Sequence, residues 1–387
     1  MCILINAERG VRLTGSYEDL NMVRFSHAAL FAVLLIVVSS PLAAKATCEE
    51  VRASIDIGSG TTKMVVALVD ACSLTIKSVL APRPGQRIEI PVEWKKGIME
   101  TDEGRKIFRP EIETAGFAAL AKLRQIGLAH GAQNLSAVAT SAFREVAPDY
   151  AYQLAARIQD QLGVPIYIIE QSEEARLGFL AAVVKLQVPR SKVLVWDIGG
   201  GSMQISVWDE MERSVTGYEG NFANNAMQSF VVDLLRRDGI AADVTPNPIL
   251  SFSEKNSPDN RLFAAIRKAE EIALSTATPE QLARFRRLPE VIGIGGVHVY
   301  SNCEVTNQSP ECDVDRDELQ AEIMAHADLT DEQLVEAGRA SSLTYAPKRI
   351  TAGALTVGFM KAFGFQRVRS LKINMADGIL VDSAYWR

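Results

Sequence analysis

The chain has 387 residues, of which 48% are hydrophobic and 23% are charged, and its formal net charge at pH 7 is −6. This length is enough for two domains of ordinary size, and the apolar content excludes a disordered chain. The acidic balance excludes a protein that binds nucleic acid over a broad basic surface, although an anion could still bind in a local positive cleft.

The N-terminal segment has the pattern of an export signal. Arg24 precedes an uncharged run over residues 28–38, and Ala44-Lys45-Ala46 fits the small-x-small pattern of a cleavage site. The run is too short for a membrane-spanning helix, which needs about 20 residues. We therefore predict that residues 1–46 are a signal peptide behind a mis-called start, with Met22 as the true start. The mature protein would be periplasmic or secreted, with no stable membrane insertion; an uncleaved anchor is the alternative.

The first stretch that carries chemistry is Ser54-Ile55-Asp56-Ile57-Gly58-Ser59-Gly60-Thr61-Thr62-Lys63. An apolar strand ends at an Asp-x-Gly turn, and a second apolar run follows over 64–69, which predicts a β-hairpin. Glycines let backbone N–H groups surround an anion, and an aspartate at a strand end can hold a cation or its waters. Lys63 either points toward this site or only covers the strand edge.

Cysteine positions agree with export. Four cysteines follow the predicted leader, an even number that an oxidising compartment favours. Cys48 and Cys72 are equidistant from the turn at Gly60, so an antiparallel hairpin would place them face to face. We predict disulfides Cys48–Cys72 and Cys303–Cys312, with four unrelated buried thiols as the alternative.

The remainder of the first half alternates strands and helices. Residues 81–110 are rich in Pro, Lys and Arg and are expected to be irregular with short strands. Further elements are predicted as a strand at 74–80, a helix from Pro110, a strand at 135–140, a helix capped by Asp149 and ended by Gly163, a strand at 165–169 and a helix capped by Ser172. This order is typical of a ribonuclease-H-like lobe.

The second half begins with another glycine hairpin, Asp197-Ile198-Gly199-Gly200-Gly201-Ser202, after the buried run 193–196. Strands are predicted at 192–198, 203–208 and 212–218, and residues 240–258 are expected to form a surface connection. A short strand then enters Gly295-Gly296, whose following helix could offer amides to phosphate. The last predicted elements are helices near 315–328, 331–338, 351–363 and 375–384 and a strand at 368–373.

Two similar phosphate hairpins resemble the plan of the actin-like superfamily, in which two lobes face a cleft. The fold class predicted is α/β, with ribonuclease-H-like lobes over 47–187 and 188–387. Five motifs in order make the chain similar to the exopolyphosphatase / guanosine pentaphosphate phosphohydrolase family. They are the two hairpins, Ala139-Thr140-Ser141-Ala142-Phe143-Arg144, Glu173-Glu174-Ala175-Arg176-Leu177 and Gly293-Ile294-Gly295-Gly296.

The resemblance implies metal-assisted removal of a terminal phosphate from inorganic polyphosphate or a guanosine penta- or tetraphosphate, with Mg²⁺ or Mn²⁺. Glu174 would orient or deprotonate the attacking water and also bind the metal, with Gln204 positioning the water. Asp56 and Asp197 would hold the metal, and Arg144 would clamp phosphate oxygens. The phosphate chain would contact Gly58, Ser59, Gly60, Thr61, Ser141, Arg144, Gly199, Gly200, Gly201, Ser202, Gly295 and Gly296. Phosphoryl transfer needs mainly positioning and charge neutralisation, which such a set supplies.

The chain departs from the family at three positions. Gln204 stands where the hairpin usually carries glutamate, and an amide can hydrogen-bond water but cannot take its proton or add charge at a metal. Gly60 and Pro148 each replace a usual asparagine. The first departure weakens the expectation of efficient hydrolysis, whereas the fold and the anion-binding cleft are unaffected.

Alternatives therefore remain open. Besides an exported phosphohydrolase, Gln204 motivates a protein that senses or binds polyphosphate or nucleotide without turnover. A kinase or ATPase of the same superfamily is disfavoured by export and by the Glu173-Glu174-Ala175-Arg176 element. The sequence does not separate polyphosphate from nucleotide, although Lys and Arg residues of 81–110 could line a basic channel. We expect a monomer or homodimer and no nucleic-acid partner.

Overall fold

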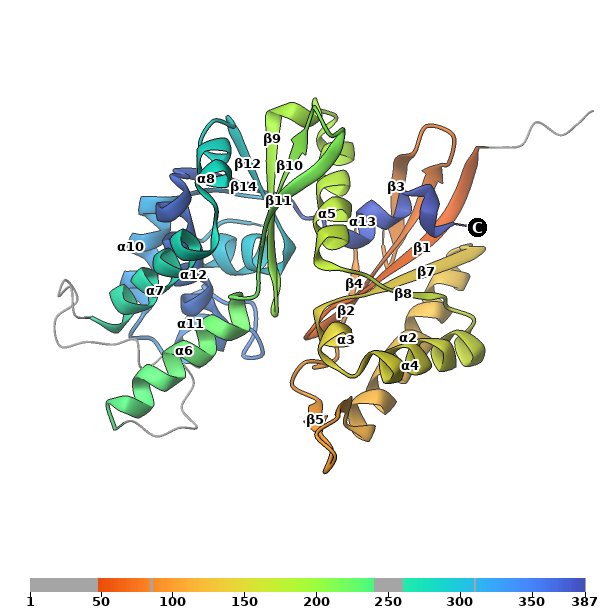
Figure 1. Cartoon of the computed structure of the whole chain (residues 1–387), viewed down its shortest axis with the longest axis horizontal. Coiled ribbons are helices and arrows are strands. Elements are labelled where there is room, and N and C mark those ends of the chain that lie inside the picture. The colour runs from red at the N-terminus through yellow and green to blue at the C-terminus, as the bar shows by residue number, and fades with distance from the viewer. Residues whose placement is uncertain (1–47, 84–85, 240–259, 310, 387) are drawn as a thin grey trace, which may run out of the picture. The chain divides into compact units, whose positions relative to one another are not determined.

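The computed structural model describes residues 48–83, 86–239, 260–309 and 311–386, which lie in one compact unit that starts at Cys48 (Figure 1). The predicted leader and the predicted surface connection at 240–258 lie outside the described residues. None of the described helices is long and apolar enough to cross a membrane.

The first sheet is built around the first hairpin. Its strands are β1 (Glu49–Ile57), β2 (Thr61–Asp70), β3 (Thr75–Ala81), β4 (Ile88–Pro91), β7 (Asn134–Ala139) and β8 (Ile166–Ile168). The order is β3-β2-β1-β7-β8, with β4 also paired to β2. β1 and β2 are antiparallel, whereas β1–β7 and β7–β8 are parallel. A separate small hairpin joins β5 (Ile98–Glu100) and β6 (Lys106–Phe108).

The second sheet repeats this arrangement. Its strands are β9 (Val193–Ile198), β10 (Met203–Asp209), β11 (Ser214–Gly220), β12 (Glu290–Ile294), β13 (Asp313–Asp315) and β14 (Arg367–Ser370), in the order β11-β10-β9-β12-β14-β13. Again an antiparallel meander is extended by parallel strands, β9–β12 and β12–β14. The two sheets confirm the predicted α/β fold with two ribonuclease-H-like lobes.

Helices cover these sheets. The first half contains α2 (Pro110–Ala129), α3 (Ser141–Glu145), α4 (Pro148–Leu162) and α5 (Gln171–Leu186). The second half contains α6 (Asn224–Arg237), α7 (Arg261–Thr276), α8 (Pro279–Phe285), α9 (Cys303–Val305), α10 (Arg316–His326), α11 (Asp331–Glu336), α12 (Arg349–Phe363) and α13 (Met375–Leu380). Short non-α turns are η1 (Arg190–Lys192), η3 (Val297–Asn302), η4 (Ala346–Lys348) and η5 (Ser383–Tyr385).

Two predicted helix caps are wrong. α4 begins at Pro148 after Ala147, because proline is already set for the first helical turn, so Asp149 lies inside the helix and pairs with Arg105. α5 begins at Gln171 after Glu170, and Ser172 lies in its first turn. The predicted end of α4 at Gly163 is correct, since that glycine is left-handed with φ of 62°.

The helices α5 and α13 connect the halves of the chain. α5 follows the first sheet in sequence but packs on β9, β10 and β11, whereas α13, near the C-terminus, packs on β1, β2 and α5 (Figure 1). Ala376, Leu380 and Val381 thereby bury against Val65 and Val69 of β2. Because α5 and α13 each pack on the sheet of the other half, the N-terminal turn of α5, which carries Glu174, lies beside the ends of both hairpins.

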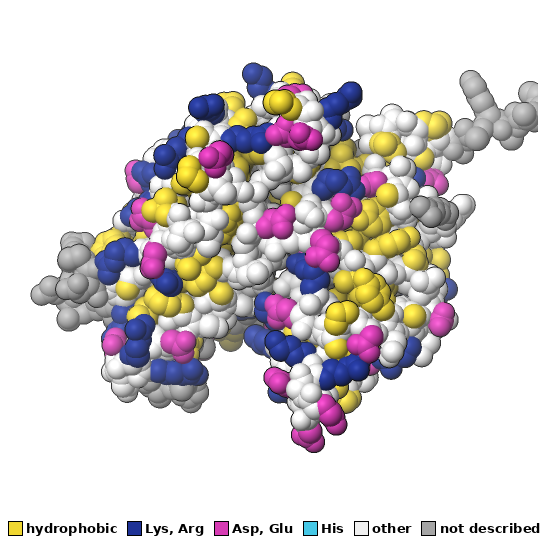
Figure 2. Space-filling view, in the orientation of Figure 1, with side chains coloured by type: hydrophobic (Ala, Val, Ile, Leu, Met, Phe, Trp, Pro, Cys, Tyr) yellow, Lys and Arg dark blue, Asp and Glu magenta, His cyan; other side chains and the backbone are white. Residues whose placement is uncertain are grey.

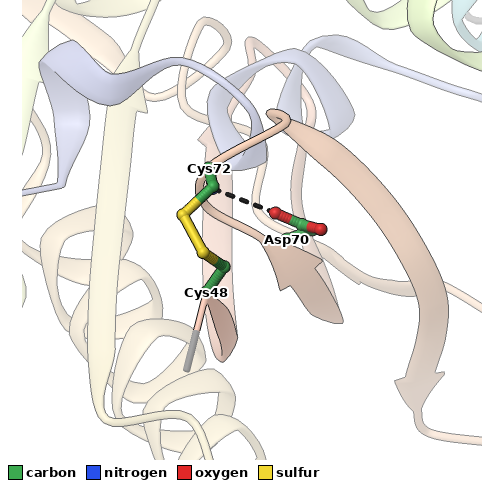
Figure 3. A group of neighbouring side chains, drawn as sticks. All are labelled: Cys48, Asp70 and Cys72. Carbon is green, nitrogen blue, oxygen red and sulfur yellow. Dashed lines mark hydrogen bonds between the residues drawn. A yellow bond between two sulfur atoms is a disulfide. The ribbon is translucent and has the colours of Figure 1, made fainter. Parts of the chain in front are cut away.

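Both predicted disulfides are present in the structure. Cys48 and Cys72 join the base of the first hairpin with Cα atoms 5.4 Å apart, and Cys303 and Cys312 join α9 to the start of β13 with Cα atoms 5.8 Å apart. Asp70 lies beside the first disulfide, where its Oδ1 accepts a hydrogen bond from the Cys72 amide (Figure 3). The same oxygen accepts a second hydrogen bond from the Ser73 amide. Potential ligand atoms of Cys48, Asp70 and Cys72 lie within 4.8 Å of one another. The two sulfurs form a disulfide and are not thiolate ligands, so this cluster stabilises the turn and is not a metal site.

Candidate active site

A cavity of about 560 Å³ lies between the two glycine hairpins and is lined by residues of both sheets. It includes most of the predicted phosphate-binding residues: Gly58, Ser59, Gly60, Thr61, Gly199, Gly200, Gly201, Ser202, Gly295 and Gly296. The predicted carboxylates Asp56, Glu174 and Asp197 and the side chain of Gln204 line the same space. Residues that are far apart in the sequence therefore meet in one cavity.

The two hairpin turns have the same backbone. The Gly58 amide donates to the Thr61 carbonyl over 3.1 Å, and the Gly199 amide donates to the Ser202 carbonyl over 2.9 Å. The strands that flank the turns pair with matching register, Asp56 opposite Lys63 and Asp197 opposite Gln204. Each turn thus holds an aspartate at the strand end and leaves backbone amides of the turn at the cavity wall.

Lys63 points into the cavity and does not merely cover the strand edge. It lies opposite Asp56 on β1 and opposite Glu89 on β4, and all three side chains line the cavity. Cross-strand neighbours on one face lie close together, so Lys63 stands between two carboxylates. The corresponding row of the second sheet is Asp197, Gln204 and the exposed Glu219.

Burial raises the pKa of both hairpin aspartates. For Asp197 the pKa rises to about 6, with Lys63 lowering it and Asp56 raising it. For Asp56 the direction is the same, again with Lys63 lowering it and Glu89 raising it. Lys63 is thus the positive charge that acts most strongly on both aspartates. Other basic side chains also line the cavity: Arg87, Lys348, Arg349 and Lys372. Acidic and basic side chains together can bind a cation and phosphate oxygens.

Glu174 lies in the first turn of α5 and is buried. Burial raises its pKa to about 8, Arg144 lowers it, and the nearby Asp56 and Asp197 raise it. A carboxylate with a pKa near neutral can both hold and release a proton under ordinary conditions, which is the requirement for a general base.

Arg144 holds Glu174. Its guanidinium makes an ion pair with the Glu174 carboxylate and donates a hydrogen bond of 2.6 Å to the Ile169 carbonyl. It is not among the described residues that line the cavity. A direct clamp on phosphate stays a prediction, whereas the contact seen in the structure makes Arg144 a positioning residue for Glu174.

Ser141 and Lys95 lie beside the second turn. A Cβ built on Gly201 would come 2.7 Å from Ser59 Oγ, 2.8 Å from Ser141 Oγ and 3.1 Å from Lys95 Nζ. Glycine is required there because these polar groups from the first half of the chain approach the backbone so closely. Lys95 is also held by Glu145 at 2.5 Å. Two hydroxyls and an ammonium group thus converge on the Gly201 turn, a combination suited to phosphate oxygens.

The backbone at Gly295 lies close to the carboxylate of Asp197. It has φ of +81°, and a Cβ there would lie 2.2 Å from Asp197 Oδ1. Both its backbone conformation and this contact require glycine. The predicted helix follows immediately, so the Gly293-Ile294-Gly295-Gly296 motif fixes the carboxylate of the other glycine hairpin in place.

Gln204 is buried in the cavity wall and its side-chain nitrogen has no hydrogen-bond partner among the described residues. An unpaired buried donor is costly, which indicates that a ligand or water completes it. An amide N–H donates to water or phosphate oxygens and cannot coordinate a cation.

The structure adds cavity residues that sequence reasoning missed. Arg87 pairs with Asp377 of α13, and the Tyr300 hydroxyl donates to Glu89 over 3.2 Å. Lys348 donates to Asn225 over 3.2 Å. Of these, only Arg87 and Glu89 lie in the stretch 81–110 that the sequence singled out. The others occupy ordinary helical or irregular segments, where no local pattern distinguishes them.

Asp56 and Asp197 fit a divalent cation. Magnesium commonly binds through one or two carboxylates, with waters and substrate phosphates completing its shell. The buried Asp56 and the half-buried Asp197, both at strand ends, supply those carboxylates. Glu174 is engaged by Arg144, so its predicted contact with the metal stays a prediction.

Comparison with known proteins agrees with this geometry. The Ppx/GppA phosphatase family model matches residues 97–216, which include Arg144, Glu174, Asp197 and Gln204. Exopolyphosphatase 1 of Mycobacterium tuberculosis and that of Mycobacterium bovis are each 24% identical to this chain over 192 residues, 46% of this chain and 55% of the relative. The match thus spans only about half the length of these curated relatives.

Solved structures show the same fold over a longer range. The Ppx/GppA family member of Aquifex aeolicus matches 87% of this chain and 98% of its own with a TM-score of 0.64 and 15% identity. An exopolyphosphatase from Cytophaga hutchinsonii matches 86% of this chain and 96% of its own with a TM-score of 0.61 and 16% identity. Residues 97–216 therefore match the Ppx/GppA phosphatase family model, and the chain has the fold of that family's solved members.

Proposed function

We propose that this protein is an exported phosphohydrolase that releases a terminal phosphate from inorganic polyphosphate or a guanosine penta- or tetraphosphate-type nucleotide. The observation that carries the proposal is the position of Glu174. Its carboxylate lines a cavity formed by two glycine turns and two aspartates, and its pKa is raised to about 8. This is the arrangement that water attack on a phosphate requires.

Glu174 accepts the proton of the attacking water. Arg144 fixes the carboxylate by an ion pair, and the hydrogen bond to the Ile169 carbonyl fixes Arg144. The Gln204 amide is the further polar group at the cavity wall that can orient the water, because its nitrogen has no other partner among the described residues. Glu174 therefore acts as the sole general base.

The glycine turns hold the phosphate chain. Ser59, Ser141 and Lys95 converge around Gly201, beside the two glycine turns that the Gly58 and Gly199 amides close. Donors fixed in place before the reaction stabilise the charge that develops on the phosphoryl group. A divalent cation held by Asp56 and Asp197 would supply further charge neutralisation at that group.

Export is supported by the paired cysteines and by the N-terminal pattern. Both predicted disulfides form within the described residues, and disulfides persist mainly outside the cytoplasm. We propose a periplasmic or secreted location with cleavage near Thr47. N-terminal sequencing of exported protein tests this, and a mature start well after Cys48 would exclude the site.

A second candidate is a binding protein with weakened turnover. Gln204 favours it, because an amide adds no charge at a metal and takes no proton. Such a protein would keep the cavity and its phosphate contacts, and would release no product over hours.

The deciding experiment measures phosphate release with Mg²⁺ from long-chain polyphosphate, guanosine pentaphosphate and ATP in parallel. We expect release from one of the first two, abolished in Glu174→Gln. Binding detected by thermal shift without release would instead support the binding protein, and transfer of phosphate from ATP to an acceptor would support a kinase.

A further inference from the structure

The charges around the two hairpin aspartates are unusual for a site that would hold a free divalent cation. Lys63 lies directly opposite Asp56, and it is the charge that acts most strongly on both Asp56 and Asp197. At the equivalent position of the second hairpin, Gln204 carries no charge. Asp56 and Asp197 are therefore accompanied across the strands by one positive charge, and the only metal ligand that these positions can add is the neutral amide oxygen of Gln204.

Lys63 is available to a ligand. It lines the cavity, and it makes no ion pair within 4.0 Å with any described acidic side chain. Glu89, on its other side, is engaged by the Tyr300 hydroxyl. The ammonium group thus faces the cavity between the two glycine turns, where it repels a cation and attracts a phosphate oxygen.

Gln204 has the same preference by a different mechanism. It is 3% exposed and its side-chain nitrogen is unpartnered among the described residues. A phosphate oxygen accepts a hydrogen bond from that donor directly, whereas a cation cannot. Both cross-strand positions therefore disfavour the metal alone and favour the metal when phosphate oxygens accompany it.

We propose that Lys63 and Gln204 make divalent-cation binding in this cleft conditional on a phosphate chain, so that metal and phosphate enter as one complex. The inference rests on the proposed function, because it assigns the order of binding at the same site. Phosphate oxygens pair with the Lys63 ammonium and accept a hydrogen bond from the Gln204 amide. They also supply the metal ligands that Asp56 and Asp197 alone do not.

The test uses Mn²⁺ as the probe and water-proton relaxation as the readout, because relaxation is enhanced only when Mn²⁺ tumbles slowly on the protein. Methylenediphosphonate serves as the phosphate analogue, since its P–C–P bridge resists hydrolysis. We expect the native protein to give enhancement with Mn²⁺ and the diphosphonate together, and little with Mn²⁺ alone.

Variants locate the effect. Gln204→Glu and Lys63→Met should each bind Mn²⁺ alone more tightly, on the order of tenfold or more. Lys372→Gln, which removes another cavity lysine outside the charges that act on either aspartate, should not. Two variants are used so that misfolding of one leaves the other informative.

Three results would overturn the proposal: tight binding of Mn²⁺ alone to the native protein, no enhancement even with the diphosphonate, or no gain in either variant. Failure of the proposed function is a separate result. Conditional Mn²⁺ binding without phosphate release from any substrate would leave this inference standing and remove the hydrolase.

Discussion

The hairpin β1–β2 carries Lys63 opposite Asp56, whereas the hairpin β9–β10 carries Gln204 opposite Asp197. Their turns share one backbone hydrogen-bond pattern, and both line the same cavity. The glycines therefore specify a common anion-binding turn, and the cross-strand residue gives each turn its own electrostatic character. A repeat of backbone structure does not imply a repeat of chemistry.

The turns also differ in their surroundings. A Cβ on Gly60 would meet only the flexible end of Glu93, at 3.4 Å, whereas a Cβ on the equivalent Gly201 would press on Ser59 and Ser141. The second turn is thus enclosed by groups from the first sheet, and the first turn is more open. This difference makes the second turn the tighter part of the phosphate site.

The prediction with the largest expected effect asks whether Glu174 or a residue of one of the hairpins is the general base. If it is Glu174 alone, Glu174→Gln should lower phosphate release about 10²–10⁴-fold. The matched control is Glu173→Gln, because Glu173 is its neighbour in α5 but bonds to Arg176 and the Tyr385 hydroxyl instead. Equal activity of the native protein and Glu174→Gln would mean that a hairpin aspartate is the general base.

The next prediction compares the equivalent glycines. Gly201→Ala should reduce the rate on the order of 10²-fold by displacing the hydroxyls that position phosphate, while Gly60→Ala should have a much smaller effect. Steady-state kinetics of both variants would check this. Similar losses in the two would mean that the turns contribute equally, contrary to the comparison.

The first hairpin is stapled at its base and the second is not. Replacing both Cys48 and Cys72 by serine should lower the free energy of unfolding by about 2–4 kcal/mol and leave the rate per folded molecule nearly unchanged. Denaturant titration without reductant measures the loss. An unchanged unfolding midpoint would show that the β1–β2 pairing needs no staple.

The smallest expected effect concerns pH. Glu174 acts as a base only when ionised, and Arg144 lowers its pKa. Arg144→Gln should therefore shift the rising limb of the pH–rate profile to higher pH, so that activity is lost most below pH 8 and partly recovered above it. The control is Lys95→Gln, which removes a cation that pairs with Glu145 and not with Glu174. The rising limb of its pH–rate profile should lie at the same pH as in the native protein.

Surface charge does not separate polyphosphate from nucleotide. On the face shown in Figure 2, basic and acidic side chains of the described residues are interspersed and do not form a continuous basic strip. The charges relevant to substrate choice line the cavity, where Arg87 and Lys348 face the same space as Glu89 and Glu93. Substrate comparison in solution therefore has to decide.

Local patterns predicted the parts of this protein that depend on near neighbours in sequence. Glycine turns after apolar strands predicted both hairpins, and the equal spacing of Cys48 and Cys72 about the turn predicted their bond. The helix caps at Asp149 and Ser172 were wrong because Pro148 begins α4 directly after Ala147 and α5 begins after Glu170, and neither helix start has a side-chain cap.

Long-range contacts decided the rest. The sequence by itself determined which residues could bind phosphate, because turn geometry and residue chemistry are local properties. Only the tertiary structure showed that Arg144 binds Glu174, that Lys63 stands between Asp56 and Glu89, and that α5 and α13 pack across the two sheets. Except for Asp56 and Lys63, which belong to one hairpin, these contacts join segments separated by tens to hundreds of residues. Burial among them shifts the pKa values on which the chemistry depends.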